Sequence, residues 1–431
     1  MTVPLPDWEP HYARRASRMR ASEIRELLKL LEQPGIISFA GGIPDPALFP
    51  VAAAREAYAA ALSSPERAGA ALQYSVSEGN LALREWIAGS MASLGVACTP
   101  DNIVITNGSQ QGIEFLGKLL LSPGDTALAT APTYLGALQA FSACEPRYDE
   151  LRPEDGNRTA PSYRDAAQAA GSEVKLAYVV PDFANPTGET LTLAARQRLL
   201  DLARELDIPV IEDAAYAALR FEGESVPPLQ ALDIRHTGSI DRSRVIYCGT
   251  FSKTLTPGLR TGWVCAAAPV VRRLVLIKQA ADLNAPAINQ MVMLEIARSV
   301  YESQVARARG HYALSATPSS VFAQVARARG HYRAKRDAML AALANYMPEG
   351  CTWTTPEGGL FVWVTLPDGI DAAALLQRAV AEAKVAFVPG GAFFTGGTGA
   401  NTMRLSYSLP GIDSIGEGIR RLAALIGEQK G

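Results

Sequence analysis

The stretch NIVITNGSQQGIEFLGKLLL, residues 102–121, reads as a short apolar strand, a tight turn at Gly108 and an α-helix. The same alternation recurs further along, as in the helical TLAARQRLLDLARELD at 192–207 and the β-branched IPVIEDAAY at 208–216. Strands that alternate with helices favour a largely parallel sheet with helices on both faces. The sequence therefore predicts an α/β fold.

The sequence also indicates more than one domain. A chain of 431 residues exceeds what one hydrophobic core usually covers. From about Tyr332, helices alternate with the strands GGLFVWVTL and MRLSYS, which is typical of a smaller α+β domain. We expect an N-terminal segment that covers the site and packs with the small domain, a large domain, a connection and the small domain, at 1–50, 51–303, 304–331 and 332–431.

The connection contains an exact repeat. QVARARGHY occupies residues 304–312 and again 324–332. A solenoid would need three or more stacked copies, and Pro318 would interrupt a continuous helix. We interpret the repeat as a tandem duplication that lengthens the connection. The TPSS sequence in the spacer predicts a surface loop with little secondary structure near 312–323.

Composition narrows the class of partner. Lys plus Arg total 41 and Asp plus Glu total 43, so the chain has neither a basic footprint for nucleic acid nor an acidic tail. No apolar run approaches bilayer length. The five cysteines form no CxxC pair, and they read as buried thiols of a reducing cytosol. We expect a cytoplasmic protein that acts on small molecules, without a metal, a membrane anchor or a nucleic acid.

The most informative stretch for chemistry is TFSKTLTPGLRTGW at 250–263, which follows the strand VIYCG. A lysine at the end of a buried strand is poorly solvated, and this lowers its pKa and makes the amine a nucleophile toward an aldehyde. Lys253 occupies this position. For an isolated Ser-Lys pair, a surface lysine near a turn is the alternative.

Two upstream motifs contain matching polar groups. Asp213 and Tyr216 end the strand of IEDAAY, where a carboxylate can keep a pyridinium nitrogen protonated and a phenol can bond the ring oxygen. A helix N-cap is the alternative for Asp213. In ANPTGET, Pro186 biases Asn185 toward an extended conformation that would point its amide into a cleft at the sheet edge. NPTG alone is also an ordinary turn sequence.

An anion site is predicted where the helix of 102–121 begins. The backbone amides of Ser109 and Gln110 open that helix, and a helix N-terminus favours a negative charge by up to about 2 kcal/mol. Ser252 and Arg260 would add hydroxyl and guanidinium donors. Capping by Ser109 is the alternative.

Two further residues complete the set of candidates. Tyr134 follows Pro132 closely and could stack on a flat ring, although a lone aromatic more often belongs to the core. Arg404 lies within the predicted strand MRLSYS without an adjacent carboxylate, so it needs an anionic partner. A substrate carboxylate or an internal salt bridge would satisfy it.

With these motifs, the sequence resembles the class I and II aminotransferases of pyridoxal-phosphate (PLP) fold type I, and it looks closest to the 2-aminoadipate, aromatic and branched-chain group. The resemblance implies a large domain with a mostly parallel seven-stranded sheet between helices and a smaller α+β domain. It covers nearly the whole chain and rests on the motifs ISFAGGIPDPALFP, LQYSVSEGNLALRE, TNGSQQGI, NPTG, EDAAY, TFSKTLTPGLRTGW, GGLFVWV, VAFVPGGAFF and MRLSYS.

The resemblance implies a role for each matching residue. Lys253 would form the Schiff base with PLP and shuttle the proton, and Tyr134 would stack on the ring. Asp213 would pair with the ring nitrogen, and Asn185 and Tyr216 with the ring oxygen. The implied contacts to the phosphate come from Ser109, Gln110, Ser252, Arg260 and, from the second subunit of a homodimer, Tyr74. The implied contacts to the substrate come from Arg404, Asn185, the backbone at Gly42, and Arg18 or Arg20 of a movable N-terminal helix.

The implied activity is a ping-pong transfer of the amino group from an L-amino acid to a 2-oxo acid, which we expect to be 2-oxoglutarate. A decarboxylase or lyase on the same scaffold is an alternative, because orientation decides which bond at Cα breaks. A PLP-binding regulatory domain is a second alternative. It would need a winged-helix domain, and roughly 20 residues ahead of the matching region are too few to fold as one.

Overall fold

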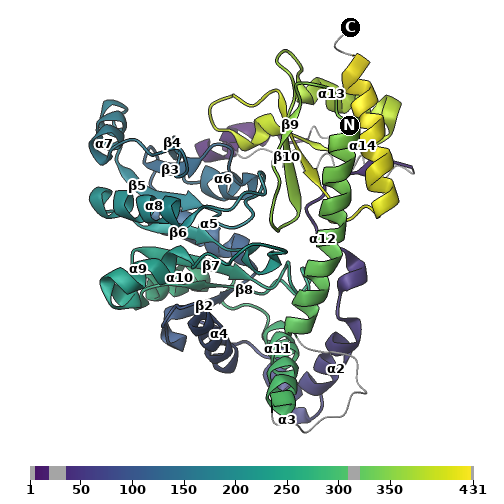
Figure 1. Ribbon diagram of the computed structural model, residues 1–431. Helices are drawn as coiled ribbons and strands as arrows, with labels where there is room; N and C mark the ends of the chain where they lie inside the picture. The colour runs from purple at the N-terminus through teal and green to yellow at the C-terminus, as the bar shows by residue number, and fades with distance from the viewer. Residues whose placement is uncertain (1–4, 19–34, 309–320, 429–431) are drawn as a thin grey trace.

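The computed structural model describes residues 5–18, 35–308 and 321–428 (Figure 1). The main sheet has seven strands in the order β2-β8-β7-β6-β5-β3-β4. Only β8 runs antiparallel to its neighbours among these strands. The predicted α/β fold with a mostly parallel seven-stranded sheet is thus confirmed. The strands are β2 (Ile103–Thr106), β3 (Thr126–Thr130), β4 (Arg147–Leu151), β5 (Val174–Val179), β6 (Val210–Asp213), β7 (Val245–Thr250) and β8 (Gly262–Cys265).

Helices cover both faces of this sheet. Alternate residues of each strand point to opposite sides, and because both sets are apolar, both faces must be buried. On one face, Leu176, Ile211 and Ile246 pack in a core shared with α5 (Ser109–Leu120), α6 (Leu135–Ser142) and α10 (Ala268–Ala281). On the other, Ala177 and Val210 join a core with α7 (Ala160–Ala169), α8 (Leu193–Leu206) and α9 (Leu229–Thr237). The helix α4 (Leu81–Ser93) packs near the β2 end.

The small domain is built on a four-stranded antiparallel sheet in the order β12-β13-β10-β9. The N-terminal segment joins it, because β1 (Ile37–Ser38) pairs in parallel with β11 (Val385–Ala386). Its other elements are β9 (Thr352–Trp353), β10 (Phe361–Thr365), α13 (Ala372–Arg378), the π-helix η7 (Ala379–Ala383), β12 (Val388–Pro389), η8 (Gly390–Phe393), β13 (Thr402–Ser406) and α14 (Ile412–Glu428).

Two long helices connect the domains. In Figure 1, α12 (Val321–Tyr346) runs along one side of the molecule, from α11 (Ala287–Ala308) to the small domain beside α14. The second copy of the repeat lies inside α12, which continues past residue 332 without a break. Of the loop expected near 312–323, residues 321–323 are helical and the remainder lies outside the described residues.

The remaining elements are short. The helices α2 (Val51–Ala61) and α3 (Pro65–Leu72) pack against α11. The 3-10 helices are η1 (Glu9–His11), η2 (Arg14–Arg18), η3 (Pro46–Leu48), η4 (Pro100–Asn102), η5 (Ala217–Leu219) and η6 (Ile240–Arg242). In the part of the chain that the structure describes, no helix combines the length and apolarity that a membrane crossing requires. No cluster of three or more His, Cys, Asp or Glu side chains suits a metal ion within the same residues.

The cysteines differ in part from the expectation that all are buried. Cys144, Cys248 and Cys265 are buried, whereas Cys98 and Cys351 are partly exposed. None of the five forms a disulfide.

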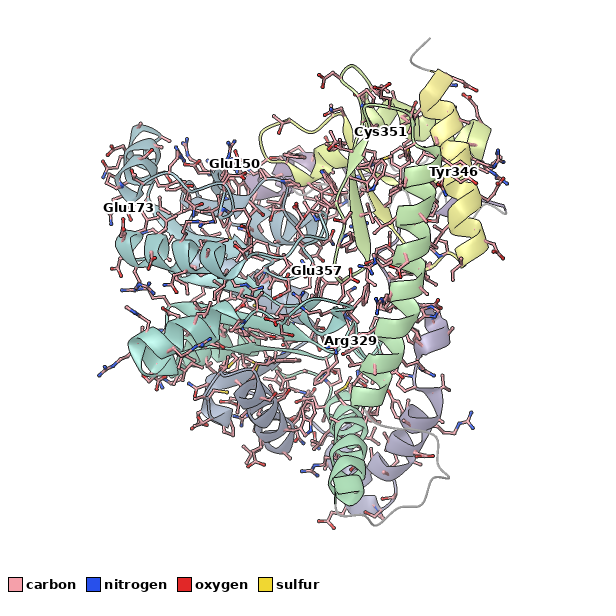
Figure 2. All side chains as sticks on the ribbon, viewed as in Figure 1. Glu150, Glu173, Arg329, Tyr346, Cys351 and Glu357 are labelled. Carbon is pink, nitrogen blue, oxygen red and sulfur yellow. The ribbon has the colours of Figure 1, made fainter. Side chains whose placement is uncertain are left out.

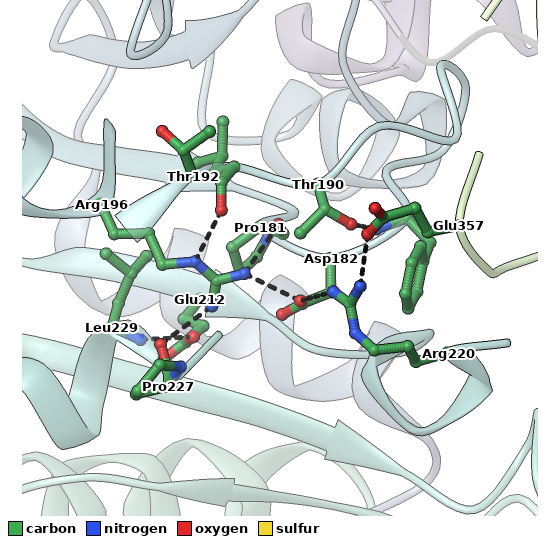
Figure 3. Close-up of polar contacts among 12 residues, drawn as sticks. Pro181, Asp182, Thr190, Thr192, Arg196, Glu212, Arg220, Pro227, Leu229 and Glu357 are labelled. Atoms are coloured by element: carbon green, nitrogen blue, oxygen red, sulfur yellow. Dashed lines mark hydrogen bonds and ion pairs between the residues drawn. The ribbon is translucent and has the colours of Figure 1, made fainter. Parts of the chain in front are cut away.

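A buried network of charges holds the chain between β5 and α8 (Figure 3). Arg196 of α8 is fully buried and donates to the carbonyls of Leu191, Pro227 and Pro181, each at 3.1 Å, and to Asp182 Oδ1 at 2.8 Å. Since Asp182 and Pro181 directly precede the loop that carries Asn185, this guanidinium fixes where that loop leaves the sheet.

The network continues into the small domain through Arg220. Its Nη1 donates to Glu357 Oε2 at 2.6 Å, and its Nη2 lies 3.6 Å from Asp182 Oδ1. Figure 2 labels Glu357 on the segment before β10, together with Arg329 on α12, which donates to the carbonyl of Ala218 at 2.8 Å. Ion pairs and hydrogen bonds thus join the two domains beside the cleft.

Replacement of Arg196 by alanine would leave Asp182 buried without its main partner. We expect Arg196→Ala to lower the free energy of unfolding by about 3–5 kcal/mol. The matched control is Arg198→Ala on the same helix, whose side chain is 44% exposed and should contribute less than about 1 kcal/mol. Urea denaturation of both variants checks this, and equal losses would contradict the buried role of Arg196.

Candidate active site

The predicted site residues meet at the carboxyl ends of β6 and β7. These strands are parallel neighbours, with Asp213 paired opposite Cys248. Asp213 is the last residue of β6, and Lys253 follows the end of β7 by one turn. Because the carboxyl ends of parallel strands share one edge of the sheet, the two side chains lie near each other, and each influences the pKa of the other.

Lys253 has few partners for its charge. Its Nζ donates to the carbonyl of Gly42 at 3.3 Å and lies 5.6 Å from the centre of the Tyr216 ring. Burial is the main cause that lowers the pKa of this amine to about 8; the nearby cations Arg260 and Arg404 act in the same direction, and Asp213 acts in the opposite one. The residue retains partial exposure, as expected for an amine at the floor of a cleft. A fully exposed turn lysine is therefore excluded.

Asp213 is 3% exposed and lies ready to receive a second donor. Its Oδ2 accepts a hydrogen bond from Tyr178 Oη at 2.8 Å, while its Oδ1 is buried without a partner among the described residues. Burial raises the pKa of this carboxyl to about 6, against the effect of Tyr178. Asp213 does not cap a helix, because η5 begins only at Ala217 with Tyr216 at its N-cap position.

Tyr178 is a site residue that the motifs did not reveal. It lies in β5 and is almost fully buried. A tyrosine inside an apolar parallel strand needs a partner for its hydroxyl, and this signal was available in KLAYVV.

The residues predicted to bind an anion meet at the start of α5. Gly108, at φ +76°, precedes the helix, and a Cβ there would come within 2.3 Å of Arg260 Nη2. Arg260 Nη1 donates to Ser252 Oγ at 3.4 Å, and Nη2 to the carbonyl of Asn107 at 3.2 Å. The amide of Ser109, the hydroxyl of Ser252 and the guanidinium of Arg260 therefore converge around a glycine that leaves room for them.

A buried polar cluster supports this predicted anion site from behind. Asp282 Oδ2 accepts from Asn107 Nδ2 at 2.7 Å and from Gln111 Nε2 at 2.8 Å. Lys278, which is fully buried, donates to both Asp282 oxygens and to Gln111 Oε1, each at 3.0 Å. Sequence reasoning missed these residues, because their contacts join segments about 170 positions apart.

Arg404 is buried without a carboxylate. Its Nη1 donates to Asn185 Oδ1 at 2.8 Å and its Nη2 to the carbonyl of Ala40 at 2.6 Å, while Nε has no partner among the described residues. The rings of Phe361 and Phe393 lie 4.4 and 5.3 Å from its guanidinium carbon. Within the described chain no acidic side chain pairs with Arg404, so no internal salt bridge forms among these residues and the guanidinium has capacity for an anionic partner.

Other predicted residues lie in varied positions. Tyr134 Oη donates to Gln110 Oε1 at 3.2 Å, and burial raises its pKa to about 12. Arg18 lies 3.7 Å from Glu145, which is an ion pair and gives no contact with the cleft. Tyr74 is 79% exposed. Arg20 and most of the expected N-terminal cover lie outside the described residues.

Comparisons with known proteins agree on one family. The profile of the family Aminotransferase class I and II matches residues 35–415. The chain is 38% identical to aromatic-amino-acid aminotransferase 1 of Thermococcus litoralis, over all of this chain and 97% of that protein. It is 40% identical to 2-aminoadipate transaminase of Thermus thermophilus, over 96% of each chain.

A solved structure agrees as well. The alpha-aminoadipate aminotransferase LysN of Thermus thermophilus, in complex with N-(5'-phosphopyridoxyl)-L-leucine, is similar with a TM-score of 0.83 and 38% identity. The match covers 98% of this chain and 99% of that one.

The lowered pKa of Lys253 predicts the pH at which its amine becomes reactive. In the protein without ligand, its amine is protonated and unreactive below its pKa, so reductive methylation should rise with a midpoint near pH 8. Arg404→Met removes a cation that disfavours the ammonium, and it should raise the midpoint. Peptide mass spectrometry across pH measures both values. A midpoint near 10.5, the ordinary lysine value, would contradict the assigned environment.

Proposed function

The chain belongs to the class I and II aminotransferases, and from this membership we propose that it moves the amino group of an L-amino acid of the 2-aminoadipate, aromatic or branched-chain type to 2-oxoglutarate. The enzyme is a PLP-dependent aminotransferase of PLP fold type I. The single observation that carries the detailed proposal is the convergence of a desolvated lysine, a buried carboxylate with one unpartnered oxygen and an arginine without a carboxylate.

The residues of the cleft fit the cofactor. The Asp213 Oδ1 atom has no partner among the described residues and can accept a hydrogen bond from the protonated ring nitrogen. The donors of Ser109, Ser252 and Arg260 suit the phosphate. From the resemblance we also assign Gln110 to the phosphate, Tyr134 to the face of the ring, and Asn185 and Tyr216 to the ring oxygen. When bound, PLP withdraws electrons from the Cα of the amino acid.

Lys253 is the proposed base. With a pKa of about 8, a substantial fraction of its amine is neutral near pH 7 to 8, where a general base is most effective. The neutral Nζ holds the cofactor and later takes the proton from Cα of the donor. Asp213 keeps a negative charge when a cation lies beside it, because the cation offsets the cost of burial. Tyr178 orients that carboxylate through its 2.8 Å hydrogen bond.

Arg404 is the proposed anchor for the α-carboxylate of both substrates. A guanidinium pairs with a carboxylate through two parallel hydrogen bonds, which fixes the orientation of Cα. Asn185 Oδ1 and the Ala40 carbonyl hold the guanidinium in place. Since donor and acceptor share this anchor, they must bind in turn, and this supports a ping-pong order. We keep the backbone at Gly42 as a substrate contact, and Arg18 or Arg20 as candidates for a distal carboxylate.

A homodimer with shared sites is part of the proposal. Leu72, Tyr74, Val76 and Leu81 form an exposed apolar group between α3 and the start of α4, with exposures of 73, 79, 58 and 54%. Such a patch is typical of a subunit interface. We assign Tyr74 to the phosphate of the second subunit. Five cysteines without a disulfide support a cytoplasmic location.

Loss of Lys253 tests the reaction. Lys253→Ala should lower turnover by at least about 10²- to 10⁴-fold, the range that general acid–base catalysis supplies. Lys118→Ala, at an exposed lysine of α5, is the control and should retain activity. The assay supplies 2-aminoadipate, aromatic or branched-chain donors with 2-oxoglutarate and quantifies the 2-oxo acid product. Release of CO₂ or ammonia instead would indicate a decarboxylase or a lyase.

Mixing two inactive variants tests the shared site. If Tyr74 acts across the interface, a hybrid dimer of Lys253→Ala and Tyr74→Ala subunits contains one intact site, and the mixture regains about a quarter of the parental activity. If Tyr74 acts within its own subunit, or if the protein sediments as a monomer, no activity returns. The measurement combines sedimentation of each variant with an assay after subunit exchange.

A further inference from the structure

Residues 40–45 form a segment that contacts both cations of the proposed mechanism. The Gly42 carbonyl accepts from Lys253 and the Ala40 carbonyl from Arg404. A Cβ on Gly42 would lie 2.5 Å from the Phe361 ring, so this backbone is pressed against the small domain. A small shift of the segment would therefore move the hydrogen-bond acceptors of both cations.

Asp45 ties the far end of this segment to α12. Its N–H donates to Tyr332 Oη at 2.9 Å, and its Oδ2 accepts from His331 Nε2 at 2.9 Å and from Lys335 Nζ at 2.7 Å. Tyr332 is fully buried and the Lys335 side chain is 5% exposed. We name Asp45, His331, Tyr332 and Lys335 the Asp45 clamp.

The clamp also reaches the strand that carries Arg404. Lys335 Nζ donates to the carbonyl of Ser408 at 2.9 Å, and Ser408 Oγ donates to the carbonyl of Gly41 at 3.2 Å. One buried ammonium thus links Asp45, the end of β13 and the glycines beside Lys253. Such a charge-assisted network has a defined geometry, which a single apolar contact would not provide.

The second copy of the nonapeptide supplies two of the clamp residues and further contacts nearby. Besides His331 and Tyr332, it contributes Gln324 and Arg327, which donate to the carbonyl of Leu48, and Arg329, which donates to the carbonyl of Ala218. Leu48 follows Asp45 in η3, and Ala218 follows Tyr216 in η5. The copy therefore contacts chain segments that adjoin the cleft at two places.

The two copies of the nonapeptide are followed by different sequences. The second is followed by RAK, so that Lys335 lies one helical turn after His331 on the same face. The first is followed by ALS, and the position that matches Lys335 is Ser315. A serine cannot supply the ammonium that Asp45 and Ser408 share.

We propose that the Asp45 clamp is a positioning device for the reaction, in which the second copy, 324–332, together with Lys335 sets the Gly42 and Ala40 carbonyls against Lys253 and Arg404. This inference rests on the proposed function. The identical first copy provides a matched control within the same chain, because each substitution can be made in either copy.

The experiment compares Tyr332→Phe with Tyr312→Phe in the holoenzyme, with Asp45→Asn as a second probe. Tyr332→Phe and Asp45→Asn should each lower kcat/KM about tenfold, mainly through KM for the amino donor, as expected for a buried group left without its partner. Tyr312→Phe should leave kcat and KM unchanged. Equal effects at the two tyrosines, or no effect at Tyr332, would overturn the proposal.

A second readout separates positioning from simple loss of stability. Without the Gly42 carbonyl in place, the ammonium of Lys253 loses an acceptor, so the midpoint of reductive methylation in the ligand-free protein should fall below that of the parent. An unchanged midpoint in folded Tyr332→Phe would contradict the clamp. This readout is independent of turnover, so a parent chain that does not transaminate would refute the proposed function alone. If Asp45→Asn does not fold, the test rests on Tyr332→Phe, which removes only one oxygen atom.

Discussion

The site depends on one electrostatic constraint: a carboxylate and an amine at adjacent strand ends, both withdrawn from water. Burial raises the pKa of Asp213 to about 6 and lowers that of Lys253 to about 8, so each group is held closer to neutrality than in solution. The parallel pairing of β6 and β7 imposes this arrangement, because the backbone hydrogen bonds fix both strand ends at the same edge. Tyr178 orients the carboxylate through its hydrogen bond, and the Gly42 carbonyl accepts a hydrogen bond from the amine.

Supporting contacts are largely buried ion pairs and backbone carbonyls. Arg196 fixes the Asn185 loop, Lys278 and Asp282 support the predicted anion site, and Lys335 holds the glycine segment. Arg196, Lys278 and Lys335 are buried cations, and each bridges chain segments distant in sequence. Breaking such a group leaves an uncompensated charge, so the supporting shell resists distortion more strongly than apolar packing would.

Much of this arrangement was predictable from sequence, for specific reasons. Short β-branched runs and amphipathic helices predicted the parallel sheet. Asp213 and Lys253 could be placed because the first ends a predicted strand and the second lies shortly after one. Tyr178, Asp282 and Asp45 could not, because their partners lie far away in sequence and no local pattern distinguishes them. The start of α12 was predicted too late, because a loop was expected up to residue 323 and the helix begins at Val321.

The isolated guanidinium of Arg404 has a consequence for handling the protein. Among the described residues, an amide and a carbonyl hold this buried cation, and in its proposed role it would attract any small planar anion that reaches it. Acetate, formate and other carboxylate buffers resemble half of an amino acid, and they would occupy this position as competitors. Apparent affinities for short substrates will therefore depend on the buffer chosen, more than on ionic strength alone.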